Sequence, residues 1–272
     1  MCWKPLPVAL LLPFCLGFCS MTLAQRPPET VIVVQDTGLD SGIQPPMPVK
    51  LGQMLTVYQQ MGGRLYVVIN APENPRARNW GWIDASCALP LDRAVPHFSD
   101  VLKKDPKDAR AYLGRAAAEL ALGQHDKVIA DCDQVLKLEP NCVAAFHFRA
   151  RAWIAKDQSE KAIADLGEVL RLEPDRADAY RMRGDLWRKQ KSYEKAGADY
   201  SRLLRLSPND CDAYLGRGEC RFEKKEYEKA IADFNEVLLR QPGSTQAYHA
   251  RGLTWYRLRT YGKAEDDFTE SI

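Results

Sequence analysis

Motifs that carry catalysis are missing from this chain. It has no HExxH, no phosphate-binding loop, no GxSxG turn and no Rossmann glycine pattern. Its four histidines are His97, His125, His147 and His249, and their spacing suggests neither metal ligands nor the base of a nucleophile. We therefore expect no catalytic residue, no metal site and no cofactor, and the chain is predicted not to be an enzyme.

A dominant charge and paired cysteine motifs are also missing. The 38 basic and 36 acidic side chains leave a net charge of +2, which gives no field to draw the chain onto nucleic acid. None of the eight cysteines forms a CxxC, and no Cys/His group has zinc spacing. We expect no nucleic-acid partner. Most cysteines beyond residue 24 are expected to be small buried residues: Cys87, Cys132, Cys142, Cys211 and Cys220.

The first 24 residues differ from the rest. Lys4 precedes an uncharged apolar run over 5–18, and Thr22-Leu23-Ala24 places small residues where a signal peptidase reads, before Gln25. Prolines interrupt the run, so a secretion signal over 1–24 is favoured over a membrane anchor, with lipidation at Cys19 as an alternative. We expect an exported, periplasmic or secreted protein, with no stable membrane span after cleavage and a flexible mature N-terminus over 25–45.

A repeat with a period of 34 residues fills the chain from about residue 107. Proline recurs at Pro106, Pro140, Pro174, Pro208 and Pro242. An aromatic residue recurs at Tyr112, Phe146, Tyr180, Tyr214 and Tyr248, and a small residue at Ala116, Ala150, Gly184, Gly218 and Gly252. A second stripe recurs at Val128, Ala162, Ala196, Ala230 and Ala264, followed four residues later by Cys132, Leu166, Tyr200, Phe234 and Phe268. Offsets of three and four predict two helices in each unit, and proline ends the second helix.

This pattern closely resembles the tetratricopeptide repeat. The resemblance implies a mainly α fold, a right-handed superhelical α-solenoid of helix pairs, with five units over 107–272 of which the last is incomplete. Ala94, Phe98 and Val101 fill second-helix positions, which predicts a solitary capping helix over 91–106. Because the chain stops at Ile272, within a second helix, we expect either a fragment of a longer array or an open apolar end that allows self-association.

Two further columns run in phase with the repeat. Arginine recurs at Arg115, Arg149, Arg183, Arg217 and Arg251, and aspartate at Asp131, Asp165, Asp199, Asp233 and Asp267. Pairing within each unit satisfies every member, so we expect one structural ion pair between the two helices of each unit. The alternative is an arginine ladder that reads phosphates. On the ion-pair interpretation, Arg183→Leu is expected to be tolerated better than Asp199→Leu.

Residues 46–90, with a start as early as residue 30, have a β-prone texture. Alternation at Leu65, Val67 and Ile69 predicts half-buried strands. Gly81-Trp82-Ile83 resembles the step that closes bacterial SH3-like domains, which implies a small β-barrel before the solenoid. The aromatic candidates for a surface groove are Tyr58, Tyr66, Trp80 and Trp82; the alternative is that some of them fill the core.

The tetratricopeptide resemblance implies a ligand groove on the concave face of the first helices. Its predicted residues are His147, Phe148, Arg151, Arg181, Asp185, Arg188, Lys189, Phe222, His249 and Tyr256. The middle of this set is basic, which favours an extended peptide with acidic groups. The Lys and Asn clamp of chaperone-binding relatives is absent, because those positions hold Leu113 and Ala117.

These features together predict an exported protein–protein interaction scaffold that binds a peptide or protein segment in the concave groove. One alternative is the non-catalytic part of a larger envelope complex. The other is a cell-wall-binding protein led by the SH3-like domain.

Overall fold

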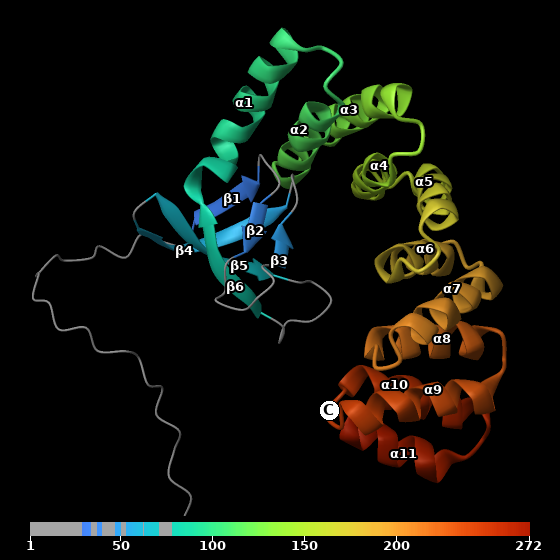
Figure 1. Ribbon diagram of the computed structural model, residues 1–272. Coiled ribbons are helices and arrows are strands. Elements are labelled where there is room, and N and C mark those ends of the chain that lie inside the picture. Colours follow the sequence, from blue (N-terminus) through green and yellow to red (C-terminus); the bar gives the residue numbers. More distant parts are fainter. Residues whose placement is uncertain (1–28, 34–36, 40–46, 50–52, 62, 71–77) are drawn as a thin grey trace, which may run out of the picture.

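The computed structural model describes residues 29–33, 37–39, 47–49, 53–61, 63–70 and 78–272. The predicted signal over 1–24 and most of the predicted flexible start over 25–45 lie outside the described residues. The described chain is mainly helical: a small unit of strands precedes a solenoid of helix pairs (Figure 1).

The strand unit is a half-barrel. Its described strands are β1 (Glu29–Val33), β2 (Thr37–Leu39), β3 (Met47–Val49), β4 (Met54–Met61), β5 (Arg64–Asn70), β6 (Arg78–Asp84) and β7 (Ala88–Pro90). Five of them form an antiparallel sheet in the order β6-β5-β4-β1-β7, and β2 pairs with β3. Because β1 lies between β4 and β7, the sheet needs residues from 29 onward and is not confined to 46–90.

The side chains on the two faces of β1 connect the half-barrel to the helices. Val31 and Val33 pack on one face of the sheet with Leu55 and Leu65, while Ile32 between them packs with Phe98 of the first helix. Successive side chains of a strand point to opposite faces, so this short strand contributes to both the cluster inside the half-barrel and the cluster with the first helix. The side chain of Tyr66 is half-buried, and the side chains of the other aromatic candidates, Tyr58, Trp80 and Trp82, lie outside the described part.

The solenoid begins after one unpaired helix. Its helices are α1 (Leu91–Lys104), α2 (Ala109–Ala121), α3 (His125–Leu138), α4 (Val143–Ala155), α5 (Ser159–Leu172), α6 (Ala177–Lys189), α7 (Tyr193–Leu206), α8 (Cys211–Glu223), α9 (Tyr227–Arg240), α10 (Thr245–Arg257) and α11 (Tyr261–Glu270). From α2 onward the even-numbered helices are the first helices of their units. Each packs against the next helix along the chain, and the pairs follow one another in an arc (Figure 1).

A left-handed residue follows the first helix of every unit. These residues have φ between 58° and 71°: Gly123, Asp157, Lys191, Lys225 and Arg259. The conformation lets the backbone close over the last helical turn, as where the Gln158 amide donates to the Trp153 carbonyl at 2.9 Å. Four of the five are not glycine, so the fold tolerates about 1 kcal/mol of strain at each of those turns.

Small residues of the first helix of a unit lie against aromatic rings of its second helix. A Cβ on Gly218 would lie 2.5 Å from the Phe234 ring, and one on Gly252 would lie 2.9 Å from the Phe268 ring. The same close approach joins α1 to α2, where the Phe98 ring covers Gly114. The small–large alternation seen in the sequence therefore sets the distance between neighbouring helices.

Candidate functional site

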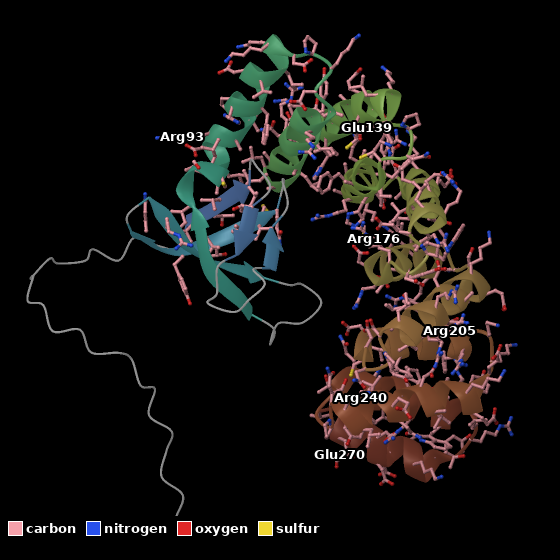
Figure 2. The ribbon with its side chains drawn as sticks, in the orientation of Figure 1. Arg93, Glu139, Arg176, Arg205, Arg240 and Glu270 are labelled. Carbon is pink, nitrogen blue, oxygen red and sulfur yellow. The ribbon has the colours of Figure 1, made fainter. Side chains whose placement is uncertain are left out.

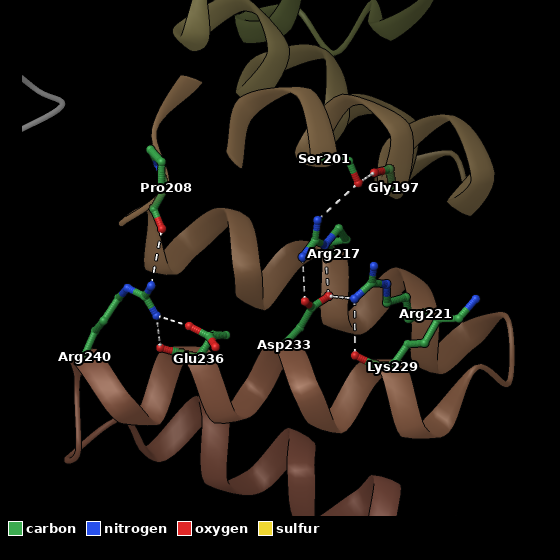
Figure 3. A network of polar contacts seen from close by, with 9 residues as sticks. All are labelled: Gly197, Ser201, Pro208, Arg217, Arg221, Lys229, Asp233, Glu236 and Arg240. Carbon is green, nitrogen blue, oxygen red and sulfur yellow. Dashed lines mark hydrogen bonds and ion pairs between the residues drawn. The ribbon is translucent and has the colours of Figure 1, made fainter. Parts of the chain in front are cut away.

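The arginine and aspartate columns form five clamps inside the units. In each unit, Nε and Nη2 of the arginine donate to the two carboxylate oxygens of the aspartate 16 residues later, at 2.6–3.0 Å. Each guanidinium also lies 5.5–5.9 Å from the centre of the aromatic ring three residues before it. Figure 3 shows the fourth unit, where Arg221 donates to the same Asp233 carboxylate as Arg217. These arginines are committed to carboxylates of their own units, which leaves little capacity to read phosphates.

The third nitrogen of the same arginines reaches the preceding repeat. Nη1 of Arg115 and Nη1 of Arg217 donate to serine hydroxyls at 3.2 and 3.3 Å, and Nη1 of Arg149 donates to Asp133 at 2.5 Å. The acceptors lie 16 residues before their arginines: Ser99, Asp133, Ser201 and Asn235. Sequence reasoning missed this contact, although the column of short polar residues was its signal. Gly167 interrupts the column, so Arg183 has no acceptor there.

The N-terminal end of the predicted groove is packed. Phe148 is half-buried and contacts the apolar clusters of α1, α2 and α3. Beside it, Nε2 of His147 lies 3.2 Å from a carboxylate oxygen of Asp178, with 11% of the histidine side chain exposed. These two predicted groove residues therefore contribute to the packing between the units.

The predicted basic middle of the groove is neutralised by its neighbours. Arg181 lies 2.5 Å from Asp210 and 3.6 Å from Asp212. Lys189 lies 2.5 Å from Asp157, in the turn between α4 and α5. The sequence expectation weighed the cations of one first helix, and stacking brings carboxylates of the adjoining units against them. This part of the groove is therefore not a free cationic surface, which differs from the expectation.

The neighbouring guanidinium is neutralised in the same way. Arg188 forms an ion pair with Glu219 of α8 and lies 3.8 Å from Asp185 of its own helix. Side chains of both signs cover the whole array, from Arg93 in α1 to Glu270 in α11 (Figure 2). Local pairing between units, rather than a field of one sign, is therefore the electrostatic pattern of the solenoid.

A hollow of the described chain opens between α6, α8 and α10. It has a volume of about 620 Å³, and its apolar lining includes Leu215, Phe222 and Leu253. Four predicted groove residues line it: Asp185, Arg188, Phe222 and His249. We call this hollow the α8 pocket, because α8 forms its middle wall.

The other predicted residues lie outside the α8 pocket. Arg151 lines a smaller hollow of about 330 Å³ between α4 and α6, together with Ile154 and Met182. Asp185 borders both hollows, so they lie next to each other along the groove. Tyr256 is 56% exposed, and its ring packs edge-on against the Tyr261 ring with the centres 5.5 Å apart.

One position of the repeat is matched in size to a residue of the preceding second helix. The residues that occupy this position are Gly114, Phe148, Met182, Gly216 and Ala250. Phe148 and Met182 are large and half-buried, whereas a Cβ on Gly216 would lie only 2.7 Å from the Tyr200 ring. The small residue at Gly216 therefore accommodates the Tyr200 ring behind the α8 pocket, a signal that was present in the sequence but was not used.

The charged lining of the α8 pocket is mainly acidic. Its carboxylates are Asp185, Asp212, Glu219 and Glu223, and its guanidinium is that of Arg188. Tyr200, behind the pocket, donates its hydroxyl to Asp185 at 2.5 Å; burial and this hydrogen bond raise the pKa of Tyr200 far above its ordinary value. The phenol therefore stays protonated and fixes Asp185 as an acceptor at the rim.

Two negative findings apply to the described residues. They contain no group of three or more His, Cys, Asp or Glu side chains that could hold a metal ion. None of their helices combines the length and the apolar character needed to cross a bilayer.

Comparison with protein families identifies the class. The tetratricopeptide repeat matches over residues 91–154, 149–211 and 198–244, which together span more than half of the chain. The chain therefore belongs to the tetratricopeptide repeat family, and its solenoid is a tetratricopeptide array. This fold is typically a non-catalytic module for protein interaction.

Solved structures share this fold at low sequence identity. YrrB, described as a TPR protein with an unusual peptide-binding site, is 21% identical, with a TM-score of 0.62 over 66% of this chain and 92% of YrrB. A MamA protein is 23% identical, with a TM-score of 0.58 over 60% of this chain and 89% of its own. MamA from Desulfovibrio magneticus RS-1 is 20% identical, with a TM-score of 0.57 over 60% and 92%. A comparison with curated proteins finds no match.

Proposed function

We propose that this protein is a non-catalytic scaffold that binds a peptide or protein segment in its concave groove, at the α8 pocket. The α8 pocket itself carries the proposal: it lies on three consecutive first helices and combines an apolar floor with a charged rim. The peptide-binding description of YrrB, which has the same fold, supports the same interpretation.

The dimensions of the α8 pocket suit an apolar anchor residue. Its volume of about 620 Å³ falls within the range of roughly 300–1,000 Å³ typical of ligand pockets. Burying one Leu or Phe side chain there contributes about 1.5–3 kcal/mol, while backbone groups of an extended segment reach the polar rim. Because Phe148 packs the N-terminal end of the groove, we place the segment along α6, α8 and α10.

The test enlarges one side chain of the α8 pocket and checks that the fold is kept. Ala250→Met enlarges a residue that lines the α8 pocket, and an unfolding midpoint equal to that of the parent chain establishes that the variant is folded. The matched control is Ala164→Met, which adds the same side chain at an exposed position of α5. Peptides selected from a random nonamer library displayed on phage are the probes, and their dissociation constants are measured by fluorescence anisotropy.

Three results are distinguishable. Loss of at least tenfold in affinity for Ala250→Met, with Ala164→Met unchanged, supports the α8 pocket as the site. Equal affinity in both variants places the site elsewhere and rejects this proposal. If the full chain selects no peptide sequence above background, the peptide-binding function is rejected as a whole.

We also propose that the protein is exported, on the strength of the apolar run and small-residue step in residues 1–24. Expression in a bacterial host followed by mass determination of the envelope fraction tests this. A mature chain beginning at Gln25 supports export, and an uncleaved chain in the cytoplasm contradicts it.

We propose a bacterial SH3-like relationship for the half-barrel, supported by its short antiparallel strands and by Gly81-Trp82-Ile83 in β6. In this interpretation the half-barrel gives the scaffold a second contact point. Co-sedimentation with purified peptidoglycan distinguishes a cell-wall contact, which pellets the chain, from a protein contact, which leaves it in solution.

A further inference from the structure

Two guanidinium groups at the edge of the α8 pocket each lie between two carboxylates, and a third, that of Arg257, lies 5.9 Å from the centre of the Phe222 ring. Arg188 lies between Glu219 and Asp185. Arg181, just outside the lining, lies between Asp210 and Asp212. A guanidinium that already has two carboxylate partners gains little from a third, so neither arginine is free to attract an acidic ligand.

Two carboxylates of the lining are only weakly compensated. The side chain of Asp212 is 87% exposed and lies 3.6 Å from Arg181, which is bound more closely to Asp210. Glu223 is exposed and forms no hydrogen bond or ion pair within the described part of the chain. Both project from α8, one near each end of that helix, with the apolar side chains of Leu215 and Phe222 between them.

We infer that the segment bound in the α8 pocket is cationic: it carries an apolar anchor flanked by lysine or arginine residues. This inference rests on the proposed function and specifies its ligand. The anchor would occupy the apolar floor at Leu215 and Leu253, and the flanking cations would face Asp212 and Glu223. Charge complementarity argues for this ligand, because an acidic segment would bring like charge to a rim that already has an excess of carboxylates.

Partial solvent exposure sets the size of the effect. Ion pairs between exposed groups are weak one by one, so the apolar anchor supplies most of the affinity and the flanking charges select the sequence. Removal of one rim carboxylate is expected to weaken binding of a cationic peptide by about twofold to fivefold. Salt screens such contacts, so raising the ionic strength should weaken binding of the cationic peptide and leave a neutral one nearly unchanged.

The experiment uses the full chain and three probe peptides. Each peptide is an acetylated and amidated nonamer with the centre Leu-Phe-Leu, flanked on both sides by three lysines, three glutamines or three glutamates. Isothermal titration at low and high salt measures the three dissociation constants. We expect the lysine peptide to bind most tightly, the glutamine peptide about tenfold more weakly, and the glutamate peptide most weakly.

Variants tie the preference to the rim of the α8 pocket. Asp212→Asn and Glu223→Gln are expected to weaken the lysine peptide and leave the glutamine peptide unchanged. Glu228→Gln, which removes an exposed carboxylate of α9 outside the lining, is the matched control and should change neither.

The outcomes separate the two proposals. If lysine, glutamine and glutamate peptides bind equally, or if the glutamate peptide binds best, the cationic ligand is refuted while peptide binding stands. A lysine preference that survives both rim variants also refutes the assignment to Asp212 and Glu223. If none of the three peptides binds, and phage selection also fails, the proposed function falls together with this inference.

Discussion

Gly167 offers a direct test of the contact between repeats. It is the position in the polar column where Arg183 has no acceptor in the preceding unit. A Cβ at this position would lie 4.0 Å from Nη1 of Arg183, so there is room for a side chain. We expect Gly167→Ser to recreate the arrangement of Ser99 and Ser201, whose hydroxyls donate to the carbonyl four residues earlier and accept from an arginine.

Helix propensity and the new hydrogen bond predict different orders of stability. Gly167→Ala removes the flexibility of glycine in a helix and should stabilise the chain by about 1 kcal/mol. Serine is a weaker helix former, so propensity alone would leave Gly167→Ser roughly 0.5 kcal/mol less stable than Gly167→Ala. A hydrogen bond from the Arg183 guanidinium contributes about 1 kcal/mol or more, which reverses that order. We therefore expect serine to be the more stabilising substitution.

Urea unfolding followed by circular dichroism at 222 nm measures the order. Repeating both substitutions in an Arg183→Lys background removes Nη1, and there serine should fall below alanine. A coupling of about 1 kcal/mol between positions 167 and 183 supports the contact. Serine less stabilising than alanine in the parent chain would refute the idea that these contacts hold neighbouring repeats together.

Three further predictions test the packing and the buried charges. Burial, with the nearby Asp131 carboxylate, raises the pKa of Glu119 to about 7 from 4.5. The free energy of unfolding should therefore decline from about pH 4.5 to 7. Glu119→Gln should flatten that decline and add up to about 3 kcal/mol at pH 8, as read from urea midpoints. A Cβ on Gly114 would lie closer than 3.0 Å to the Phe98 ring of α1, so Gly114→Ala should destabilise the chain by about 1–3 kcal/mol and lower its melting temperature. A Cβ on Gly197 would meet open space, so Gly197→Ala should raise the melting temperature. The Asp199 side chain is 8% exposed and that of Arg183 is 24% exposed. Arg183→Leu leaves the more buried charge, the Asp199 carboxylate, without its partner and should cost about 3–5 kcal/mol, more than Asp199→Leu. Equal urea midpoints for the two variants would contradict this.

The last of these expectations reverses the one drawn from the sequence. An apolar residue is usual at the arginine position of the tetratricopeptide repeat, so the sequence suggested that leucine would be tolerated there. The structure shows that the carboxylate is the deeper of the two groups, and a buried charge without a partner is more costly than one that can reach water. Burial of each partner depends on how the two helices pack, which the periodicity does not specify.

The α8 pocket shows the same limit for the functional site. Sequence reasoning placed Asp185, Arg188, Phe222 and His249 on the concave face, and all four line one hollow. It also placed Phe148 there, although that ring packs between the first units. The difference arises because a side chain on the concave face either lines the groove or fills it, according to the size of its neighbours in adjoining units.

Offsets along the chain were enough to determine the helix pairs. The recurrence of Pro106 and its equivalents marked the end of each second helix, and spacings of three and four marked the buried face. The spacing of 16 residues from Arg115 to Asp131 likewise joins two helices that a short turn holds together. Each of these features depends on residues of a single unit, so its information is local.

Only the tertiary structure decided the features that involve two units. The contact of Arg149 with Asp133, the pairing of Arg188 with Glu219 and the acidic rim of the α8 pocket all join side chains of successive repeats. Their geometry depends on how one helix pair is rotated and shifted against the next, which follows from packing over the whole interface. The sequence therefore determined what each repeat is, and the stacking of repeats determined which side chains meet in the groove.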